Sequence, residues 1–194
     1  MATSAIDRMN AELREFVDGI YGSHTKTLVF GEGSANSDIV LVGEAPGEQE
    51  SLLGRPFVGR AGKNLDFFLE KTGIDRAGLY VTNAVKFRPV KVSKAGNTVN
   101  RAPTREEIAL FLPWLKREID IIRPKCVVTL GNTALQALLG RGKVVGDMHG
   151  SFSKLDGRLV FALYHPASVI YNPSLKDVYA NDLATLGQWR QHLT

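Results

Sequence analysis

The sequence predicts an α/β fold, a three-layer α/β/α sandwich with a central four-stranded, mainly parallel sheet. Three observations support this prediction. Short apolar, β-branched runs alternate with segments of helical periodicity, which is the order found in parallel sheets covered on both faces. The 194 residues are enough to bury a core, and 44% of them are hydrophobic, as in ordinary globular proteins. No repeat or low-complexity tract divides the sequence, so residues 1–194 are predicted to form a single domain.

The individual elements follow from local patterns. Helices are indicated where apolar residues recur at helical spacing. Thr104, followed three residues later by Glu107, makes a capping box at the start of one helix, and Pro124 follows its end. We expect strands at residues 38–42, 79–85, 125–130 and 159–163, and helices at residues 7–20, 61–71, 104–122, 132–139 and 177–193.

Composition narrows the class of protein. The net charge of +4 and the sequence pI of about 9.2 suit a polyanionic partner, although many basic proteins bind no nucleic acid. No apolar run approaches the roughly 20 residues of a membrane helix, and the N-terminus lacks a signal-peptide pattern. The single cysteine, Cys126, excludes an internal disulfide and is expected to be a buried thiol. We therefore expect a cytoplasmic protein that does not bind membranes, with a monomer as the default state.

Unusual residues follow all four predicted strands. Gly43–Gly47 comes after the first strand, Asn83 lies near the end of the second, Gly131 and Asn132 follow the third, and His165 and Pro166 follow the fourth. Ligands of parallel sheets bind outside the carboxyl ends of the strands, so these loops are predicted to meet at one rim. Residues 88–103 are expected to form an irregular, mobile, basic loop beside it.

Each motif also has a plain structural interpretation. The glycine-rich turn 43–47 could be an ordinary strand-to-helix connection, and Phe57, between glycines and arginines, could be a core side chain. Asn83 and His165 could simply be polar groups satisfied in turns. The motifs become specific only when they are taken together.

Taken together, they resemble the thermophile-type, or family-four, uracil-DNA glycosylases. The resemblance runs in one collinear order from about Val29 to the C-terminus. Its segments are G-E-A-P-G-x-x-E at 43–50, G-R-P-F-V-G-R-A-G at 54–62, V-T-N-x-V-K-x-R-P at 81–89, N-R-x-P-T at 100–104, L-G-x-x-A at 130–134 and H-P-A at 165–167. The block around Phe57 combined with the G-E-A-P-G turn is the most specific part.

Three departures from the family pattern are informative. Relatives of this type carry four cysteines that bind a four-iron, four-sulfur cluster, and Cys126 matches none of them. The corresponding positions here are Phe16, Gly19, Phe87 and Phe111. We expect no cluster, no other cofactor and no metal, with an apolar plug in the cluster's place.

The other two departures concern function. One branch of the superfamily is trapped covalently on uracil DNA through a histidine; the aligned residue here is Asn100, whose amide is no nucleophile, which favours turnover. Tyr171 stands where relatives commonly have arginine, which leaves open the residue that fills the gap of a flipped base.

The resemblance implies a role for each site residue. Phe57 would stack on a flipped uracil, and Asn83 would read its edge by donating to O4 and accepting from N3–H. His165 would donate to uracil O2 as negative charge develops, supported by backbone N–H groups of the turn 43–47, in which Gly43, Ala45, Pro46 and Gly47 would contact the base. Glu44, or failing that Glu50, would position water; the sequence does not separate these two.

The same resemblance suggests residues that meet DNA. Backbone phosphates would contact basic residues, a helix N-terminus and a hydroxyl, and two apolar residues could wedge into the base stack. These candidates are Arg55, Arg60, Lys86, Arg88, Gly131, Asn132 and Ser168 for phosphate, with Val169 and Ile170 as wedges.

The sequence therefore predicts a uracil-DNA glycosylase acting on single- or double-stranded DNA. Two alternatives stay open within the same superfamily: a uracil-DNA binding protein with little turnover, and a glycosylase for another deaminated base. A nucleotide-binding α/β domain is disfavoured, because the glycine turn lacks the patterns of such phosphate sites.

Overall fold

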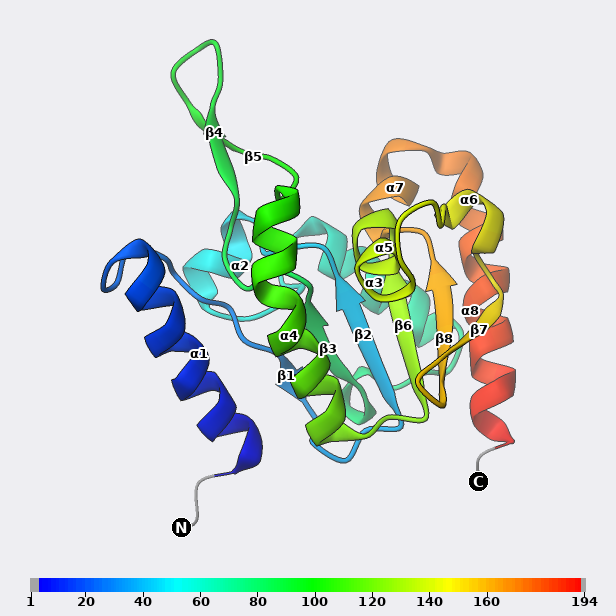
Figure 1. The fold of residues 1–194 in the computed structure, drawn as a ribbon. Helices are drawn as coiled ribbons and strands as arrows, with labels where there is room; N and C mark the ends of the chain where they lie inside the picture. Colours follow the sequence, from blue (N-terminus) through cyan, green and yellow to red (C-terminus); the bar gives the residue numbers. More distant parts are fainter. Residues whose placement is uncertain (1–3, 193–194) are drawn as a thin grey trace.

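A computed structural model, which describes residues 4–192, shows a sheet between two helical layers (Figure 1). Within these residues the sheet has six strands in the order β1-β3-β2-β6-β8-β7. The four inner strands are parallel, and the two edge strands are antiparallel to their neighbours. The strands are β1 (Glu32–Gly33), β2 (Ile39–Gly43), β3 (Tyr80–Asn83), β6 (Cys126–Leu130), β7 (Phe152–Leu155) and β8 (Arg158–Leu163).

The α/β prediction and the mainly parallel sheet are confirmed, and the four predicted strands are the four parallel ones. The predicted total of four is too low, because both edge strands escaped notice. β1 is only two residues long, and β7 lies at an edge, where its residues are half-buried or exposed and show no buried run. Neither therefore carries the apolar pattern that reveals an inner strand.

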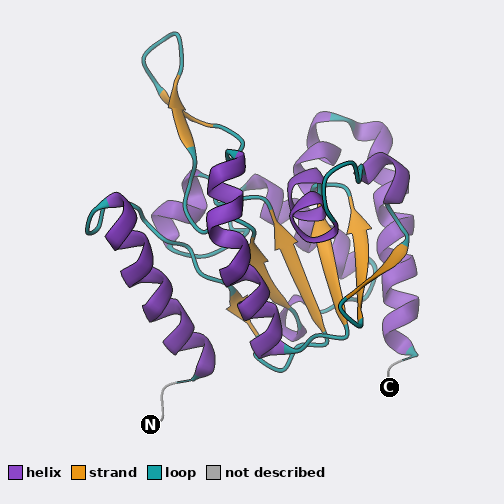
Figure 2. Ribbon diagram, viewed as in Figure 1, coloured by secondary structure: helices purple, strands orange, loops and turns teal. Residues whose placement is uncertain are grey.

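The two faces of the sheet are covered by different helices (Figures 1 and 2). Alternate residues of β2 show this: Ile39 and Leu41 pack with α3 and α8, whereas Val40 and Val42 pack with α4 and α5. α1 lies against α4. The helices are α1 (Ala5–Tyr21), α3 (Arg60–Lys71), α4 (Arg105–Ile122), α5 (Asn132–Leu139) and α8 (Lys176–Gln191).

All five predicted helices are present, with ends that differ by up to two residues. Thr104 and Glu107 form the predicted capping box of α4: the Thr104 hydroxyl accepts from the Glu107 N–H and the Glu107 carboxylate accepts from the Thr104 N–H. The predicted end of the last helix, residue 193, lies outside the described residues. Short helices that were not predicted are α2 (Glu48–Leu53), α6 (Val145–Met148), α7 (Pro166–Tyr171) and 3-10 helices at Arg76–Gly78 and Pro173–Leu175.

Residues 88–103 are more regular than predicted. They contain an antiparallel hairpin of β4 (Val90–Val92) and β5 (Thr98–Asn100), which projects from the body of the molecule beyond the ends of the parallel strands (Figure 1). Gly96 closes its turn with a positive φ of 80°. Val90 and Val92 are exposed, so the run lacks the half-buried alternation by which a strand is recognised.

An aromatic plug lies between α1, α4 and the segment after β3. Phe87 and Phe111 are almost fully buried, with ring centroids 5.6 Å apart, and Tyr21 packs on Phe87 at the same distance. Phe16, by contrast, is 38% exposed and packs on Trp114 at the edge of the plug. Of the three aromatic replacements from which a plug was predicted, Phe87 and Phe111 are buried in it and Phe16 lies only at its edge.

The region does not fit an iron–sulfur cluster. Gly19 is exposed on α1, and none of the four aligned positions carries a thiol. Cys126, the one cysteine, is fully buried in β6, and burial raises its pKa to about 12. No helix in residues 4–192 is long and apolar enough to cross a membrane.

Candidate active site

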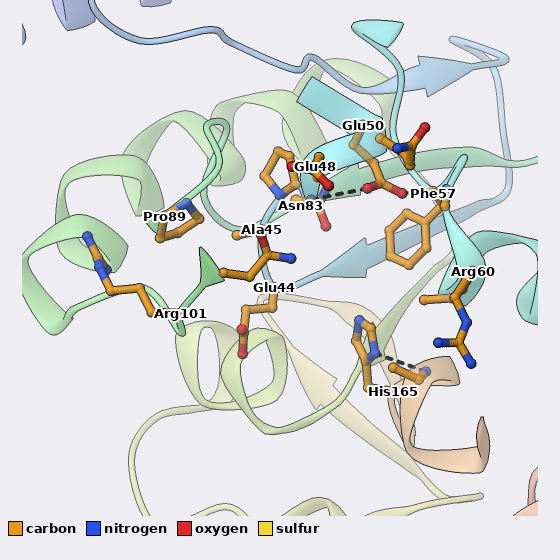
Figure 3. Close-up of a pocket in the computed structure, with 17 residues that line it drawn as sticks. Glu44, Ala45, Glu48, Glu50, Phe57, Arg60, Asn83, Pro89, Arg101 and His165 are labelled. Atoms are coloured by element: carbon orange, nitrogen blue, oxygen red, sulfur yellow. Dashed lines mark hydrogen bonds between the residues drawn. The ribbon is translucent and has the colours of Figure 1, made fainter. Parts of the chain in front are cut away.

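A cavity of about 360 Å³ opens at the carboxyl ends of the parallel strands, where the loops were predicted to meet (Figure 3). It brings together residues from the loops after β2, β3 and β8, from the start of α3 and from the base of the hairpin. Its lining consists of Glu44–Glu50, Phe57, Gly59–Ala61, Asn83, Pro89, Asn100, Arg101, His165 and Ala167.

Gly43 lies against two side chains that line the cavity, Asn83 and Phe57. A Cβ built on Gly43 would lie 2.4 Å from Asn83 Oδ1 and 2.4 Å from Phe57 Cζ, far inside van der Waals contact. Only glycine therefore allows the Asn83 amide and the Phe57 ring to approach each other here. Among the described residues, no side-chain hydrogen bond uses the Asn83 amide, so both of its polar atoms are available to a ligand.

Phe57 is held in a conformation that is unusual for an aromatic residue. Its φ is +54°, a left-handed value that costs free energy for any residue with a Cβ. Surrounding contacts fix it: Arg76 donates to the carbonyl oxygens of Pro56 and Phe57 at 3.1 and 3.3 Å and forms an ion pair with Asp66 at 2.5 Å. The ring is 6% exposed and forms a preorganised wall of the cavity.

The Glu50 carboxylate ties two loops together. It accepts from the backbone N–H groups of Val58 at 3.0 Å and Gly59 at 2.7 Å, in the loop that carries Phe57. It also accepts from the Gly47 N–H at 3.2 Å, in the turn after β2. These bonds occupy much of its acceptor capacity, so Glu50 acts chiefly as a clamp between the loops.

The Glu44 carboxylate lies on the other side of the cavity. It accepts a hydrogen bond from the hydroxyl of Thr133, in the first turn of α5. This contact places the Glu44 carboxylate at the cavity wall beside the N-terminal turn of α5. The structure therefore gives the two glutamates different surroundings, which the sequence left unresolved. Thr133 was not predicted, since only the tertiary fold brings it to Glu44.

His165 precedes α7, and its ring faces the cavity (Figure 3). Its Nδ1 accepts from the Ala167 N–H at 3.2 Å. Burial lowers the pKa of the imidazole to about 4, against a smaller opposing effect of Glu50. The ring is therefore neutral near pH 7, and because Nδ1 is an acceptor, Nε2 carries the proton and can donate into the cavity.

The predicted DNA-contacting residues divide into several groups. Arg60 is exposed and lines the cavity, and Asn132 is exposed at the start of α5. Ser168 and Ile170 are half-buried on α7. Arg88 forms an ion pair with Glu48 at 3.2 Å and donates to Asn100 Oδ1 at 2.6 Å. Arg60 thus lines the cavity, Arg88 contacts two of its lining residues, and Ser168 follows the lining residue Ala167 in the chain.

Other members of the predicted set lie elsewhere. Arg55 is exposed but donates to Glu32, and both line a separate hollow at the β1 edge of the sheet. Gly131 is buried, and a Cβ built there would lie 3.1 Å from the His165 Cβ, so its visible contribution is to support His165.

Two predictions are wrong. Lys86 is 1% exposed and forms an ion pair with the buried Glu118 at 2.6 Å, so its ammonium cannot meet a phosphate. Val169 is 2% exposed and packs in the core on the α3 side, so it cannot wedge between bases. The exposed large side chain of this segment is Tyr171, at 81%.

Comparison with known proteins places this arrangement in a family. A family model described as the uracil DNA glycosylase superfamily matches residues 30–185. The chain belongs to the uracil-DNA glycosylase superfamily. This assignment covers every motif around the cavity.

Individual relatives agree with the superfamily assignment. A type-4 uracil-DNA glycosylase of Thermotoga maritima is 41% identical over 149 residues, which cover 76% of this chain and 73% of that protein. The type-4 enzyme of Archaeoglobus fulgidus is 37% identical over 177 residues, covering 84% and 83%. A solved structure of Pedobacter heparinus SMUG2 has the same fold, with a TM-score of 0.56 at 12% identity over 82% of this chain and 77% of that one.

Proposed function

We propose that this protein is a uracil-DNA glycosylase, which flips uracil out of DNA and hydrolyses its N-glycosidic bond to leave an abasic site. The observation that carries this proposal is the convergence of Phe57, Asn83 and His165 on one cavity. These side chains offer an aromatic face, an amide and a neutral N–H donor, which together complement a pyrimidine with two carbonyl groups.

Recognition of the base would use the first two groups. A base extruded from DNA would stack on the Phe57 ring, a contact typically contributing about 1–3 kcal/mol. Asn83 would donate to uracil O4 and accept from N3–H. Cytosine presents the opposite pattern at these atoms and would leave buried polar groups unpaired, so it would be rejected.

Bond cleavage would use the third group and a carboxylate. As the glycosidic bond breaks, the uracil gains negative charge and the sugar positive charge. His165 Nε2–H would donate to O2 of the departing uracil, an interaction that in oxyanion sites contributes about 2.7–4 kcal/mol. Glu44, rather than the occupied Glu50, would hold the attacking water and stabilise the sugar cation. No step in this route calls on a metal or a redox cofactor.

The DNA would cross the mouth of the cavity. Arg60, which lines the cavity, and Arg88, which contacts its lining, would bind phosphates of single- or double-stranded DNA, together with Asn132 and Ser168. The hairpin would add Lys91 and Lys94, which are exposed beyond the rim. We propose that the protein acts on DNA as a monomer, which sizing of the free protein and of its DNA complex would test. We propose the cytoplasm as its place of action.

The activity is tested with an oligonucleotide that carries one uracil. The protein is incubated with it and with the matched thymine oligonucleotide, and abasic sites are then cleaved with alkali. We expect multiple-turnover release of uracil alone, reduced at least about a hundredfold in Asn83→Ala and His165→Ala. Glu44→Ala should also lower the rate of uracil release, whereas its matched control Glu70→Ala, at an exposed position on α3, should retain activity.

Two outcomes would favour the alternatives. Uracil-specific binding without release would indicate a binding protein of low turnover. Release of hypoxanthine or xanthine but not uracil would indicate a different deaminated base. Absence of both cleavage and binding would refute the proposed function.

A further inference from the structure

The buried Lys86 lies directly behind Asn83. Successive residues of β3 point to opposite faces of the sheet, so the Asn83 side chain enters the cavity while Tyr80 and Thr82 face α4. The chain turns after Asn83, and the Lys86 side chain folds back on the α4 face. Its Nζ donates to the backbone carbonyl oxygen of Asn83 at 2.8 Å.

The remaining donors of this ammonium are also matched. Nζ donates to Thr82 Oγ1 at 2.5 Å and to Glu118 Oε2 at 2.6 Å. Glu118, which is 0% exposed, in turn accepts from the Tyr80 hydroxyl at 2.9 Å and from the Thr82 hydroxyl at 3.1 Å. Three ammonium hydrogens thus meet three acceptors in a closed, buried network.

The backbone at Gly31, just before β1, lies against this network. A Cβ on Gly31 would lie 2.4 Å from the Tyr80 hydroxyl and 2.5 Å from Glu118 Oε1, so only glycine leaves room for the two polar groups. Burial and the neighbouring Glu118 raise the pKa of Tyr80 far above its usual value, so its hydroxyl stays a donor. The network therefore depends on Gly31 and Tyr80 as well as on the charged pair Lys86 and Glu118.

Stability alone does not account for such a network. Taking two charges out of water costs about as much free energy as their attraction returns. Proteins in which apolar residues of similar size replace a buried ion pair are often equally stable or more stable. The network contacts one group that matters for recognition, the main chain of Asn83. The same turn is fixed from the other side, where the N–H groups of Ala84 and Val85 donate to the carbonyl oxygens of Gly43 and Glu44 at 2.8 and 3.0 Å.

We propose that Lys86 and Glu118 are positioning residues, which fix the backbone of Asn83 so that its amide meets the uracil edge. This inference rests on the proposed function. A shift of about an ångström at Asn83 would misalign both of its hydrogen bonds to the base, although neither Lys86 nor Glu118 touches the substrate. The buried ion pair thereby contributes to base recognition from the opposite face of the sheet.

The test uses the double variant Lys86→Met/Glu118→Met, which removes both charges and leaves neither buried without its partner. Single-turnover uracil release is measured for this variant in the wild-type background and in the Asn83→Ala background. We expect at least about a tenfold loss in the wild-type background. In the Asn83→Ala background we expect a change within about twofold, because the network acts through Asn83.

Leu115→Ala is the matched control, since Leu115 is fully buried on α4 one turn before Glu118. It removes core packing but none of the polar groups of the network, so its effect on the rate should be the same factor in both backgrounds. A double variant that releases uracil as fast as the wild type would overturn the inference. So would an equal loss in both backgrounds, which a general loss of stability would produce.

A second measurement does not depend on activity, so failure of the proposed function stays distinguishable. Hydrogen exchange of the backbone amides of Ala84 and Val85 is compared between the double variant and the wild type. In the double variant we expect at least about tenfold faster exchange at these two amides and an unchanged rate at the Val81 amide. In the Leu115→Ala control we expect the exchange of Ala84 and Val85 to be unchanged. Unchanged exchange at Ala84 and Val85 would overturn the positioning role even if the wild type released no uracil.

Discussion

The clearest energetic difference within the cavity lies between Glu50 and Glu44. Glu50 accepts from three backbone N–H groups in two loops, whereas Glu44 accepts from one hydroxyl. We therefore expect Glu50→Ala to lower both stability and activity. Glu44→Ala is expected to lower activity with little effect on stability.

The magnitude follows from the contacts. Hydrogen bonds to a charged group contribute about 1.5–3 kcal/mol each, so the two shorter bonds of Glu50 would give roughly 3–6 kcal/mol. Because Glu50 is half-buried, water can replace part of the lost carboxylate, which favours the lower limit of about 3 kcal/mol. For a domain of this size, 1 kcal/mol corresponds to about 2–4 °C in Tm. Glu50→Ala should thus lower Tm by roughly 6–12 °C, and Glu44→Ala by at most about 4 °C.

Glu50→Gln refines the same prediction. Its remaining oxygen can still accept from Val58 and Gly59, but its amide nitrogen would face the Gly47 N–H, donor against donor. We expect a loss of about half that of the alanine variant.

Thermal unfolding followed by circular dichroism, together with uracil release at 25 °C, would check these values. A Glu50→Ala protein with wild-type Tm would refute the assignment of Glu50 as the clamp. A larger fall in Tm for Glu44→Ala than for Glu50→Ala would refute it as well.

Four further predictions follow from other contacts. Gly43→Ala should reduce uracil release at least about a hundredfold, because the new Cβ collides with the Asn83 amide and the Phe57 ring; near-normal kinetics would contradict the geometry. The folded-state pKa of His165 is lowered to about 4, so the unfolded chain binds the extra proton between about pH 4 and 6.5, and stability should fall by roughly 3 kcal/mol as pH drops through that window. Denaturant titrations of His165→Gln should show a correspondingly weaker pH dependence. Phe111→Ala should cost about 3–5 kcal/mol of unfolding free energy in the plug, and a loss below about 1 kcal/mol would show that the plug collapses without cost. Tyr171→Ala should slow release from double-stranded more than from single-stranded DNA if this exposed side chain fills the gap of the flipped base; equal effects on both substrates would argue against it.

Much of the fold could be predicted because it depends on local patterns. The apolar runs of the inner strands and the capping box of α4 are complete within a few residues. The motifs of the cavity could be predicted for a related reason: they follow strand ends, and parallel strands end at the same edge of a sheet. Asn83 and His165 therefore line the same cavity although they are 82 positions apart in the sequence, from position 83 to position 165.

The remainder depended on partners that are distant in the sequence. Lysine is usually exposed, and nothing near Lys86 indicates burial; the decision comes from Glu118, 32 residues later. Val169 follows the H-P-A motif, which led us to expect an exposed side chain. The packing of α7 on α3 instead directs this side chain into the core. Thr133 likewise became part of the site only when α5 placed its hydroxyl beside Glu44.

The aromatic plug and the Lys86 network together explain how the site can keep its shape without a cluster. Lys86 and Phe87 are consecutive, and in the structure one side chain fixes the main chain at Asn83 while the other fills the plug against Phe111. A cluster ligated at position 87 would have fixed this same segment, four positions beyond Asn83. Packed aromatic rings hold it instead through van der Waals contact, and they require no metal for folding. The plug also packs against Ala45, which lines the cavity, so the same aromatic rings support both the turn after β2 and the segment after β3.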